Sequence, residues 1–272
     1  MQQTSPHKPV TSKENATIKY LRSLSDPKIR KKEHAFLIEG IKMVEEALRD
    51  DLGVTLVIAA QNLLQHHGKG ILKLAETKRI KIFWISERLM DFLSESKTPQ
   101  PVMAVAKMKE HSESELINQA AGLIIVAHQL QDPGNLGTII RTAEAVNASG
   151  IAITRNTVDP LNPKVIRASM GSILRVPIVS IPDISRFISS CKQNGFQTIA
   201  TDVIAKQTHF DLDLKRKTLV ILGQEGSGLP GDLMDLVDVQ IKIPMAGTID
   251  SLNVATAATV ILYEAFRQRI SM

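Results

Sequence analysis

The sequence predicts an α/β protein of two domains, because short apolar runs of strand length alternate with amphipathic stretches of helical length. In the second half the run Leu123–Ala127 is continuously apolar, as is typical of parallel strands covered by helices on both faces. A chain of 272 residues is long enough for one large domain or two ordinary ones.

The first half predicts the smaller α/β domain. Ile18, Leu21 and Leu24 recur at helical spacing with basic residues between and after them, so a basic helical segment is expected. After it we expect a strand at 36–38, a helix at 41–49, a strand at 54–59, a helix at 71–78 and strands at 80–85 and 102–106. Residues 1–15 are polar and are expected to form a disordered tail.

A polar stretch from 107 to 119 marks the expected boundary between domains. We therefore expect one domain at 16–110, a linker at 111–120 and a second domain at 121–272. The second domain should be a parallel sheet with helices on both sides. Its expected strands lie at 123–127, 151–154, 177–180, 197–201, 218–222 and 239–243, and its expected helices at 136–147, 165–174, 184–193 and 252–269.

Positive charge is concentrated in the first part of the chain. The formal net charge is +5, and residues 1–110 hold 19 of the 33 Lys and Arg but only 13 of the 28 Asp and Glu. A basic half beside a neutral half indicates a module that binds a polyanion such as nucleic acid. An ordinary solvated surface explains the charge alone equally well.

Cysteine usage and hydropathy exclude several classes of protein. A single cysteine, Cys191, cannot form an internal disulfide or a thiolate metal site, which favours a reducing compartment, a cytoplasmic location and no bound metal. Cys191 is expected to be a small core residue and not a nucleophile. No apolar run is long enough to cross a bilayer, and Met1–Val10 lacks the apolar core of a secretory signal.

Three loops of the second domain each follow an apolar strand, where ligands bind in open α/β sheets. The first, 131–138, contains a Pro-Gly turn and runs into a helix that carries Arg141. Asn135 is expected to be the N-cap of that helix, and a helix start attracts anions. Taken alone, Asn135 could be only a cap and Arg141 only a surface charge.

The second and third loops, 223–230 and 243–255, have their own signals. Three glycines in six residues of the second loop allow close approach of the backbone to a ligand, but neither a P-loop nor a dinucleotide fingerprint is present. In the third loop Ser251 is expected to cap the final helix. Asn253 is a poor helix former at this position, which invites a role in a site.

Together the three loops resemble the signature motifs of the SpoU/TrmH branch of the SPOUT methyltransferases. Asn135 and Arg141 resemble motif one, and the pattern Gly223-x-Glu225-x-x-Gly228 resembles motif two. The stretch from Pro244 to Val254 resembles motif three. The first half resembles the substrate-binding domain of these enzymes through Ser12, Asn15, Ile18, Lys19, Leu21, Ser23, Leu24, Lys28, Arg30, Phe36, Ile38, Glu39 and Gly40.

The resemblance implies a fold, a cofactor and an oligomeric state. The second domain would form a deep trefoil knot, and the protein would be a homodimer with active sites at the interface. S-adenosylmethionine would bind in the knot, held largely by backbone groups of the last two loops. The matching positions are Leu222, Gly223, Glu225, Gly226, Ile243, Met245, Ser251, Leu252 and Asn253.

The implied reaction is methylation of a ribose 2′-hydroxyl in RNA, and the first motif is most similar to rRNA-directed members. The implied catalytic residues are Arg141, Asn135, Glu225, Ser251 and Asn253. A guanidinium is a poor base, so we expect Arg141 to hold a phosphate and stabilise developing alkoxide charge, oriented by Asn135 or Glu225. The residues expected to contact RNA phosphates are Lys19, Arg22, Lys28, Arg30, Lys31 and Lys32.

Several alternatives remain open at this point. The substrate could be tRNA, the methylated group could be a base, or the protein could be a non-catalytic RNA-binding factor for ribosome assembly. A nicotinamide-dependent oxidoreductase would need a glycine-rich turn that is missing. Asp250 and Ala255 depart from the residues that are frequent in the family, Glu and Ser, and this puts cofactor affinity in question.

Overall fold

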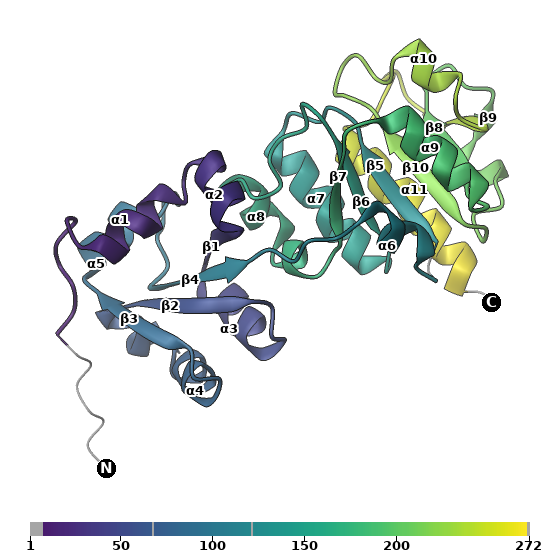
Figure 1. Ribbon diagram of the computed structural model, residues 1–272. Helices are drawn as coiled ribbons and strands as arrows, with labels where there is room; N and C mark the ends of the chain where they lie inside the picture. Colours follow the sequence, from purple (N-terminus) through teal and green to yellow (C-terminus); the bar gives the residue numbers. More distant parts are fainter. Residues whose placement is uncertain (1–7, 67, 121, 271–272) are drawn as a thin grey trace. The chain divides into compact units, whose positions relative to one another are not determined.

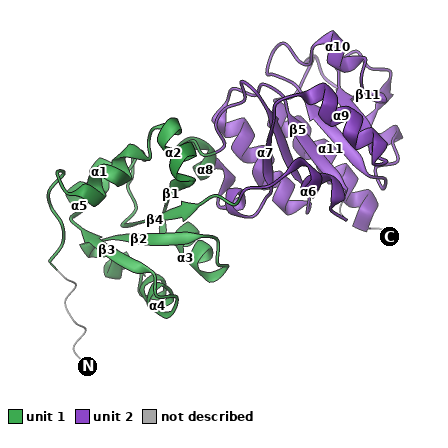
Figure 2. Cartoon of the chain, viewed as in Figure 1, with its two compact units in different colours: residues 1–109, 161–167 green, residues 110–160, 168–272 purple. Residues whose placement is uncertain are grey.

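The computed structural model describes residues 8–66, 68–120 and 122–270. The chain divides into two compact units (Figure 2). Residues 1–109 and 161–167 form the first unit, and residues 110–160 and 168–272 form the second. Both units are α/β, as the sequence predicts.

The first unit contains a four-stranded mixed sheet in the order β1-β4-β2-β3 (Figure 1). Strands β1 (Ala35–Glu39) and β2 (Val54–Ala60) both run antiparallel to β4 (Val102–Lys107), and β3 (Lys81–Ile85) runs parallel to β2. The helices of this unit are α1 (Ala16–Ser23), α2 (Pro27–Glu33), α3 (Ile41–Arg49), the 3₁₀ helix η1 (Gln61–His66), α4 (Lys69–Thr77) and α5 (Glu87–Leu93).

The expected basic segment is two helices with a break between them. Asp26 is the N-cap of α2 and accepts a hydrogen bond from the Lys28 backbone at 2.8 Å, and Pro27 occupies the first helical position. Both residue types favour a new helix start over a continued helix. Ile18 and Leu21 of α1 are fully buried in a cluster with Ile58 of β2.

The expected disordered tail is corrected in part. Residues 1–7 of the tail lie outside the described residues, but Val10 pairs with Ile85 as an isolated parallel bridge. Its amide donates to the Trp84 carbonyl and its carbonyl accepts from the Ser86 amide, each at 3.0 Å. These bonds place Val10 beside β3, the edge strand of the sheet, so the chain is already ordered at Val10.

The second unit contains a seven-stranded sheet in the order β7-β6-β5-β10-β8-β11-β9, and every neighbouring pair is parallel. Its strands are β5 (Leu123–Ala127), β6 (Gly150–Thr154), β7 (Ile178–Ile181), β8 (Gln197–Thr201), β9 (Gln207–Thr208), β10 (Thr218–Leu222) and β11 (Val239–Lys242). Strand β10 lies between β5 and β8, which both precede it in the sequence. The loops after β5 and β10 are therefore neighbours.

Helices cover both faces of this sheet (Figure 1). They are α6 (Glu113–Asn118), α7 (Pro133–Ala145), α8 (Pro163–Ser169, which the two units share), the 3₁₀ helices η2 (Ser172–Leu174) and η3 (His209–Asp211), α9 (Ile184–Gln193), α10 (Gly231–Met234) and α11 (Val254–Ile270). Helices α7 and α11 pack against each other. On the other face Phe187 and Cys191 of α9 pack against Val126 and Ile221 of the sheet. Cys191 is a buried core residue, as expected, and burial raises the pKa of its thiol to about 12.

Two regions differ from the sequence expectation. The expected linker contains α6, which begins with a capping box between Ser112 and Glu115 and buries Leu116. The helix expected at 165–174 is interrupted after α8, because Met170 and Gly171 adopt positive φ angles of 51° and 92°. A left-handed pair ends a right-handed helix, and the chain continues as η2.

Within the described ranges no helix is both long and apolar enough to cross a membrane. Among the same residues no three side chains of His, Cys, Asp or Glu gather as the ligands of a metal ion would.

Candidate active site

The three loops singled out in the sequence leave the same edge of the second sheet. Strands β5 and β10 are paired in register, with Ala127 opposite Leu222, so the loops that follow them start side by side. The third loop follows β11 and leads into α11, which packs against α7. This is the carboxyl edge of a parallel sheet, where the chemistry of such folds is usually found.

Three side chains, one from each loop, form a continuous series of hydrogen bonds. The Asn253 amide donates to Oδ1 of Asn135 at 2.9 Å, and the Asn135 amide donates to Oε1 of Glu225 at 2.8 Å. A carboxylate only accepts, so the Asn135 amide nitrogen must face Glu225 and its oxygen must face Asn253. The directions of both amides are therefore fixed by Glu225.

The caps of the two helices at the site differ from the expected ones. Asp132, and not Asn135, is the N-cap of α7, and its side chain accepts from the Asn135 backbone at 2.8 Å. Asn253, and not Ser251, caps α11, because its Oδ1 accepts from the backbones of Ala255 and Thr256 at 2.9 and 3.3 Å. Asn253 thus holds the start of α11 with one side-chain atom and Asn135 with the other, which explains a poor helix former at this position.

Glu225 is held as a carboxylate. Partial burial raises the pKa of its carboxyl group, but hydrogen bonds from the Asn135 side chain and from the backbones of Glu225, Gln131 and Asp132 outweigh burial and hold the pKa below its ordinary value. An ionised carboxylate whose oxygens are already hydrogen-bonded is a weak proton acceptor. Glu225 therefore anchors the loop that carries Gln131 and Asn135 to its own loop.

The loop after β10 folds back on itself as a tight hairpin of backbone. Gln224 and Gly228 exchange hydrogen bonds of 3.1 and 2.9 Å. A Cβ atom at Gly223 would lie 2.4 Å from the carbonyl carbon of Gly228, so only glycine fits there. Gly226, with φ of 95°, has open space where a Cβ would be. A ligand could approach this backbone closely.

The other expected cofactor positions lie at the same edge. Leu222 is buried at the end of β10, and Ile243, Met245 and Leu252 are partly buried, while Ser251 is exposed. Apolar walls beside exposed backbone and an open hydroxyl suit a nucleoside-containing ligand, with the apolar groups against its flat ring. The described residues of the loops after β10 and β11 thus fit S-adenosylmethionine.

Arg141 is not part of the hydrogen-bonded series. Six residues of α-helix place it roughly 9 Å farther along α7 than Asn135 and about 120° around the axis. Its side chain is exposed and forms no hydrogen bond or ion pair with any residue that the structure describes. The expected orientation of Arg141 by Asn135 or Glu225 is therefore absent from this arrangement, since those two residues bind each other.

The expected RNA-contacting residues of the first unit separate into two groups. Lys19, Arg22, Lys28, Lys31 and Lys32 are exposed on α1 and α2. Arg30 is only 3% exposed, and its guanidinium donates to the backbone carbonyls of Leu24 and Ser25 at 2.9 and 2.8 Å. The prediction that Arg30 contacts RNA is corrected, because the side chain is directed inward and holds the turn between α1 and α2.

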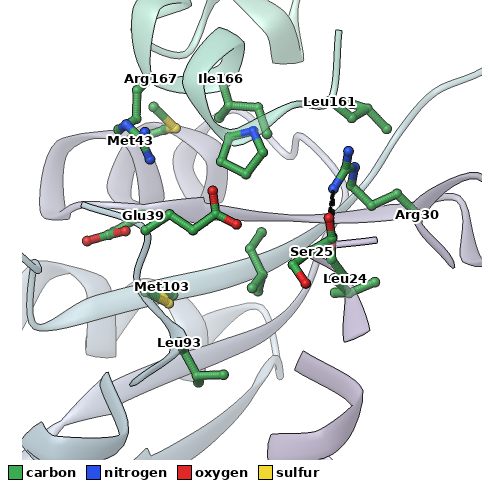
Figure 3. Close-up of a pocket in the computed structure, with 13 residues that line it drawn as sticks. Leu24, Ser25, Arg30, Glu39, Met43, Leu93, Met103, Leu161, Ile166 and Arg167 are labelled. Atoms are coloured by element: carbon green, nitrogen blue, oxygen red, sulfur yellow. Dashed lines mark hydrogen bonds between the residues drawn. The ribbon is translucent and has the colours of Figure 1, made fainter. Parts of the chain in front are cut away.

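A small hollow, partly open to solvent, lies within the first unit (Figure 3). Arg30 and Glu39 line it together with apolar side chains such as Leu93 and Met103. Of the residues expected in a site, only Arg30 lines this hollow. The candidate active site is thus defined by the converging loops of the second unit and not by a closed cavity.

Two family models match the chain. The SpoU rRNA Methylase family matches residues 122–263, and the MRM3-like substrate binding domain matches residues 15–104. Residues 122–263 include all three loops of the candidate site.

Individual relatives extend over most of the chain. A tRNA/rRNA methyltransferase of Synechocystis sp. is 35% identical over 96% of this chain and 94% of its own length. The 23S rRNA (uridine(2479)-2′-O)-methyltransferase of Streptomyces viridochromogenes is 32% identical over 87% of this chain and 84% of its own. The 23S rRNA (guanosine(2553)-2′-O)-methyltransferase RlmP of Bacillus subtilis is 30% identical over 94% and 98%.

A solved structure agrees with these relatives. The AdoMet-bound rRNA methyltransferase from Sinorhizobium meliloti superposes with a TM-score of 0.83 at 30% identity, over 96% of this chain and 97% of that one.

Proposed function

Because the chain belongs to the SpoU rRNA methylase family, we propose that this RNA methyltransferase transfers a methyl group from S-adenosylmethionine to a ribose 2′-hydroxyl in 23S rRNA. The observation that carries the proposal is the series Asn253–Asn135–Glu225, which ties together the three loops of the family match. Two relatives named as 23S rRNA 2′-O-methyltransferases favour rRNA over tRNA. Their names give different nucleotides, a uridine and a guanosine, so they do not identify the nucleotide that this protein would modify.

The cofactor supplies an electrophilic methyl group on a sulfonium centre. Backbone groups of Gly223 and Gly226 would hold it, because both positions lack a Cβ atom and Gly226 faces open space. The walls would come from the partly buried side chains of Ile243, Met245 and Leu252.

Arg141 would act on the RNA and not on the cofactor. A guanidinium stays protonated at any physiological pH, so Arg141 cannot accept the proton of the 2′-hydroxyl. Its two-pronged donor set fits a phosphate oxygen pair and would stabilise negative charge that develops on the ribose oxygen. Glu225 is held in its ionised form by its hydrogen bonds and is a weak base. A phosphate oxygen or a water molecule would therefore take the proton, and Ser251 and Asn253 would line the polar side of the site.

The protein would act as a homodimer. The second unit exposes several large apolar side chains, among them Ile204 at 83%, Phe210 at 64% and Tyr263 at 48%. A second copy that covered these side chains would remove their apolar area from water. A second copy would also give Arg141 neighbours that one copy lacks. The trefoil knot stays a prediction, and we place the enzyme in the cytoplasm with its rRNA substrate.

The test is methyl transfer from labelled S-adenosylmethionine to separate pools of unmodified rRNA and tRNA, followed by digestion to nucleosides. We expect label in a 2′-O-methylnucleoside from the rRNA pool. Label in the tRNA pool would contradict the choice of substrate, and label on a base would contradict the ribose assignment. Cofactor and RNA binding without label would favour the non-catalytic assembly factor.

A further inference from the structure

The turn that follows β6 is fastened to the loop that follows β5. The Gln129 amide donates to Oγ1 of Thr154 at 3.1 Å, and Oγ1 of Thr157 donates to the Ala127 carbonyl at 3.1 Å. The Val158 amide donates to the Leu130 carbonyl at 2.8 Å. Residues 154–158 therefore form a rigid platform beside the first loop of the candidate site.

Gln131 closes this platform with its side chain. Its amide donates to the carbonyls of Gln129 and Asn156. Both of those residues have left-handed backbone, with φ of 55° and 64°. This region is unfavourable for Gln129, whereas asparagine adopts it more readily than most residues. One side chain thus holds two turns together, and the strain at Gln129 persists because its surroundings fix it.

Gln131 also reaches the candidate active site. Its backbone amide donates to Oε2 of Glu225 at 3.3 Å, while Oε1 of Glu225 accepts from Asn135. One residue thus connects the turn after β6 with the anchor of the three loops. The position of the turn is fixed relative to Asn135 and Glu225.

Arg155 is the cationic side chain that this platform carries. Its guanidinium is exposed and forms no hydrogen bond or ion pair with any residue within the described ranges, while its backbone carbonyl accepts from Oγ1 of Thr154 at 3.3 Å. Its neighbours on both sides are fixed, because Thr154 is bonded to Gln129 and the Asn156 carbonyl is bonded to Gln131. An unpaired guanidinium on a rigid base loses little backbone freedom when it binds an anion.

We propose that Arg155 binds a backbone phosphate of the RNA strand that enters the active site. This inference rests on the proposed function, because it takes RNA as the substrate. Besides the RNA contacts expected from the basic helices of the first unit, the second unit would then have a phosphate contact of its own. Gln131 would be the residue that positions this contact. A phosphate held at this edge would fix the strand along the sheet edge that carries Asn135 and Glu225.

The experiment compares wild type with Arg155→Ala, Arg155→Lys and Gln131→Glu, using an unmodified 23S rRNA transcript. The variant Gln131→Glu keeps the size of the side chain but removes the amide that holds both turns. We expect Arg155→Ala to raise the Kd for the transcript about tenfold and to reduce the salt slope of binding by about one. Arg155→Lys should recover part of this loss, and Gln131→Glu should weaken RNA binding in the same direction.

A matched control is Arg216→Ala, which removes the same charge from an exposed residue at the amino end of β10, the opposite edge of the sheet. We expect the control to bind the transcript like wild type. Equal losses in Arg155→Ala and Arg216→Ala would overturn the inference, as would an unchanged salt slope in Arg155→Ala. An increased Kd for S-adenosylmethionine in Arg155→Ala would also overturn it, since the substitution would then disturb the structure of the cofactor site. These are binding measurements, so a failure of methyl transfer by wild type would contradict the proposed function separately.

Discussion

Asn253 donates a hydrogen bond to Asn135 at 2.9 Å although 118 residues separate them in the chain. Asn135 in turn donates a hydrogen bond to Glu225, 90 residues away in sequence, at 2.8 Å. No side chain in this series can be replaced by its isosteric acid or amide without a mismatch. Asp at 135 or 253 would set an acceptor against an acceptor. Gln at 225 would set its amide against a donor, because both oxygens of Glu225 accept hydrogen bonds, from Asn135 and from the Gln131 backbone. The three loops are therefore positioned as one unit.

Asn135→Ala should disconnect the loops. The change removes two side-chain hydrogen bonds and leaves Glu225 with fewer donors, which should lower the free energy of unfolding by about 1–3 kcal/mol. Methyl transfer in single turnover should fall by about tenfold to a hundredfold, because the loops lose their relative placement. Asn118→Ala, at an exposed residue of α6, is the control and should behave as wild type. An unchanged turnover rate for Asn135→Ala would show that the series is not needed for activity.

Glu225 should make the stability of the second unit sensitive to acid. Its folded pKa lies below its ordinary value, so the ionised carboxylate stabilises the fold at every pH above the unfolded pKa of about 4.3. That contribution should be lost as the pH falls through the lower folded pKa. Urea unfolding of wild type and Glu225→Gln at pH 7 and at lower pH measures it. The difference in unfolding free energy should shrink in acid, and a constant difference would contradict the lowered pKa.

Gly223→Ala should damage cofactor binding. The added methyl group would come within 2.4 Å of the Gly228 backbone and would have to displace the hairpin 223–228. We expect S-adenosylmethionine to bind at least about tenfold more weakly in calorimetry. Gly231→Ala is the matched control, because its Cβ atom meets nothing within 4 Å. Equal cofactor affinities in the two variants would argue against the hairpin as the cofactor cradle.

Arg141→Lys separates charge from geometry. The lysine keeps one positive charge but loses the planar pair of donors that fits a phosphate. We expect the melting temperature to stay unchanged, because Arg141 is exposed, and the single-turnover rate to fall by about a hundredfold. Full activity of Arg141→Lys would show that a point charge suffices and that the two-pronged contact is absent.

Arg30 and Lys31 are neighbours in sequence, but we expect Arg30 to affect stability and Lys31 to affect RNA binding. Arg30→Ala removes the hydrogen bonds from a buried guanidinium to the carbonyls of Leu24 and Ser25 and should lower the free energy of unfolding by about 2–4 kcal/mol. Lys31→Ala changes an exposed charge, so stability should hold while the salt slope of RNA binding falls by about one. Chemical denaturation and salt-dependent RNA binding of both variants test the pair. A stable Arg30→Ala protein with a reduced salt slope would restore Arg30 as an RNA contact.

Sequence patterns predicted the second unit well because its strands are buried on both faces. The strands at 123–127, 197–201 and 218–222 and the helix at 184–193 match the structure residue for residue. The family predicted from the three loops is confirmed by the family model over residues 122–263. Continuous apolar runs and glycine-rich loops are local signals, so they can be read without knowing what the segments touch.

The errors arose where tertiary contacts decide between equal local choices. Asp132 and Asn135 are both good N-caps. Because Asp132 caps α7, the side chain of Asn135 is free to bond Glu225 in another loop. Arg30 lies in a basic segment, and only the fold shows that backbone carbonyls surround its guanidinium. Gln131 stood in the first motif without an assigned role, because its partners come from other turns.

Burial of Cys191 makes the protein convenient for site-specific labelling. The chain has no other cysteine, and a thiol with a pKa of about 12 holds almost no thiolate at neutral pH. Maleimides and other thiol reagents should therefore leave the folded protein unmodified. A fluorophore or spin label can then be attached through a cysteine introduced at a chosen surface position, without first removing the native one.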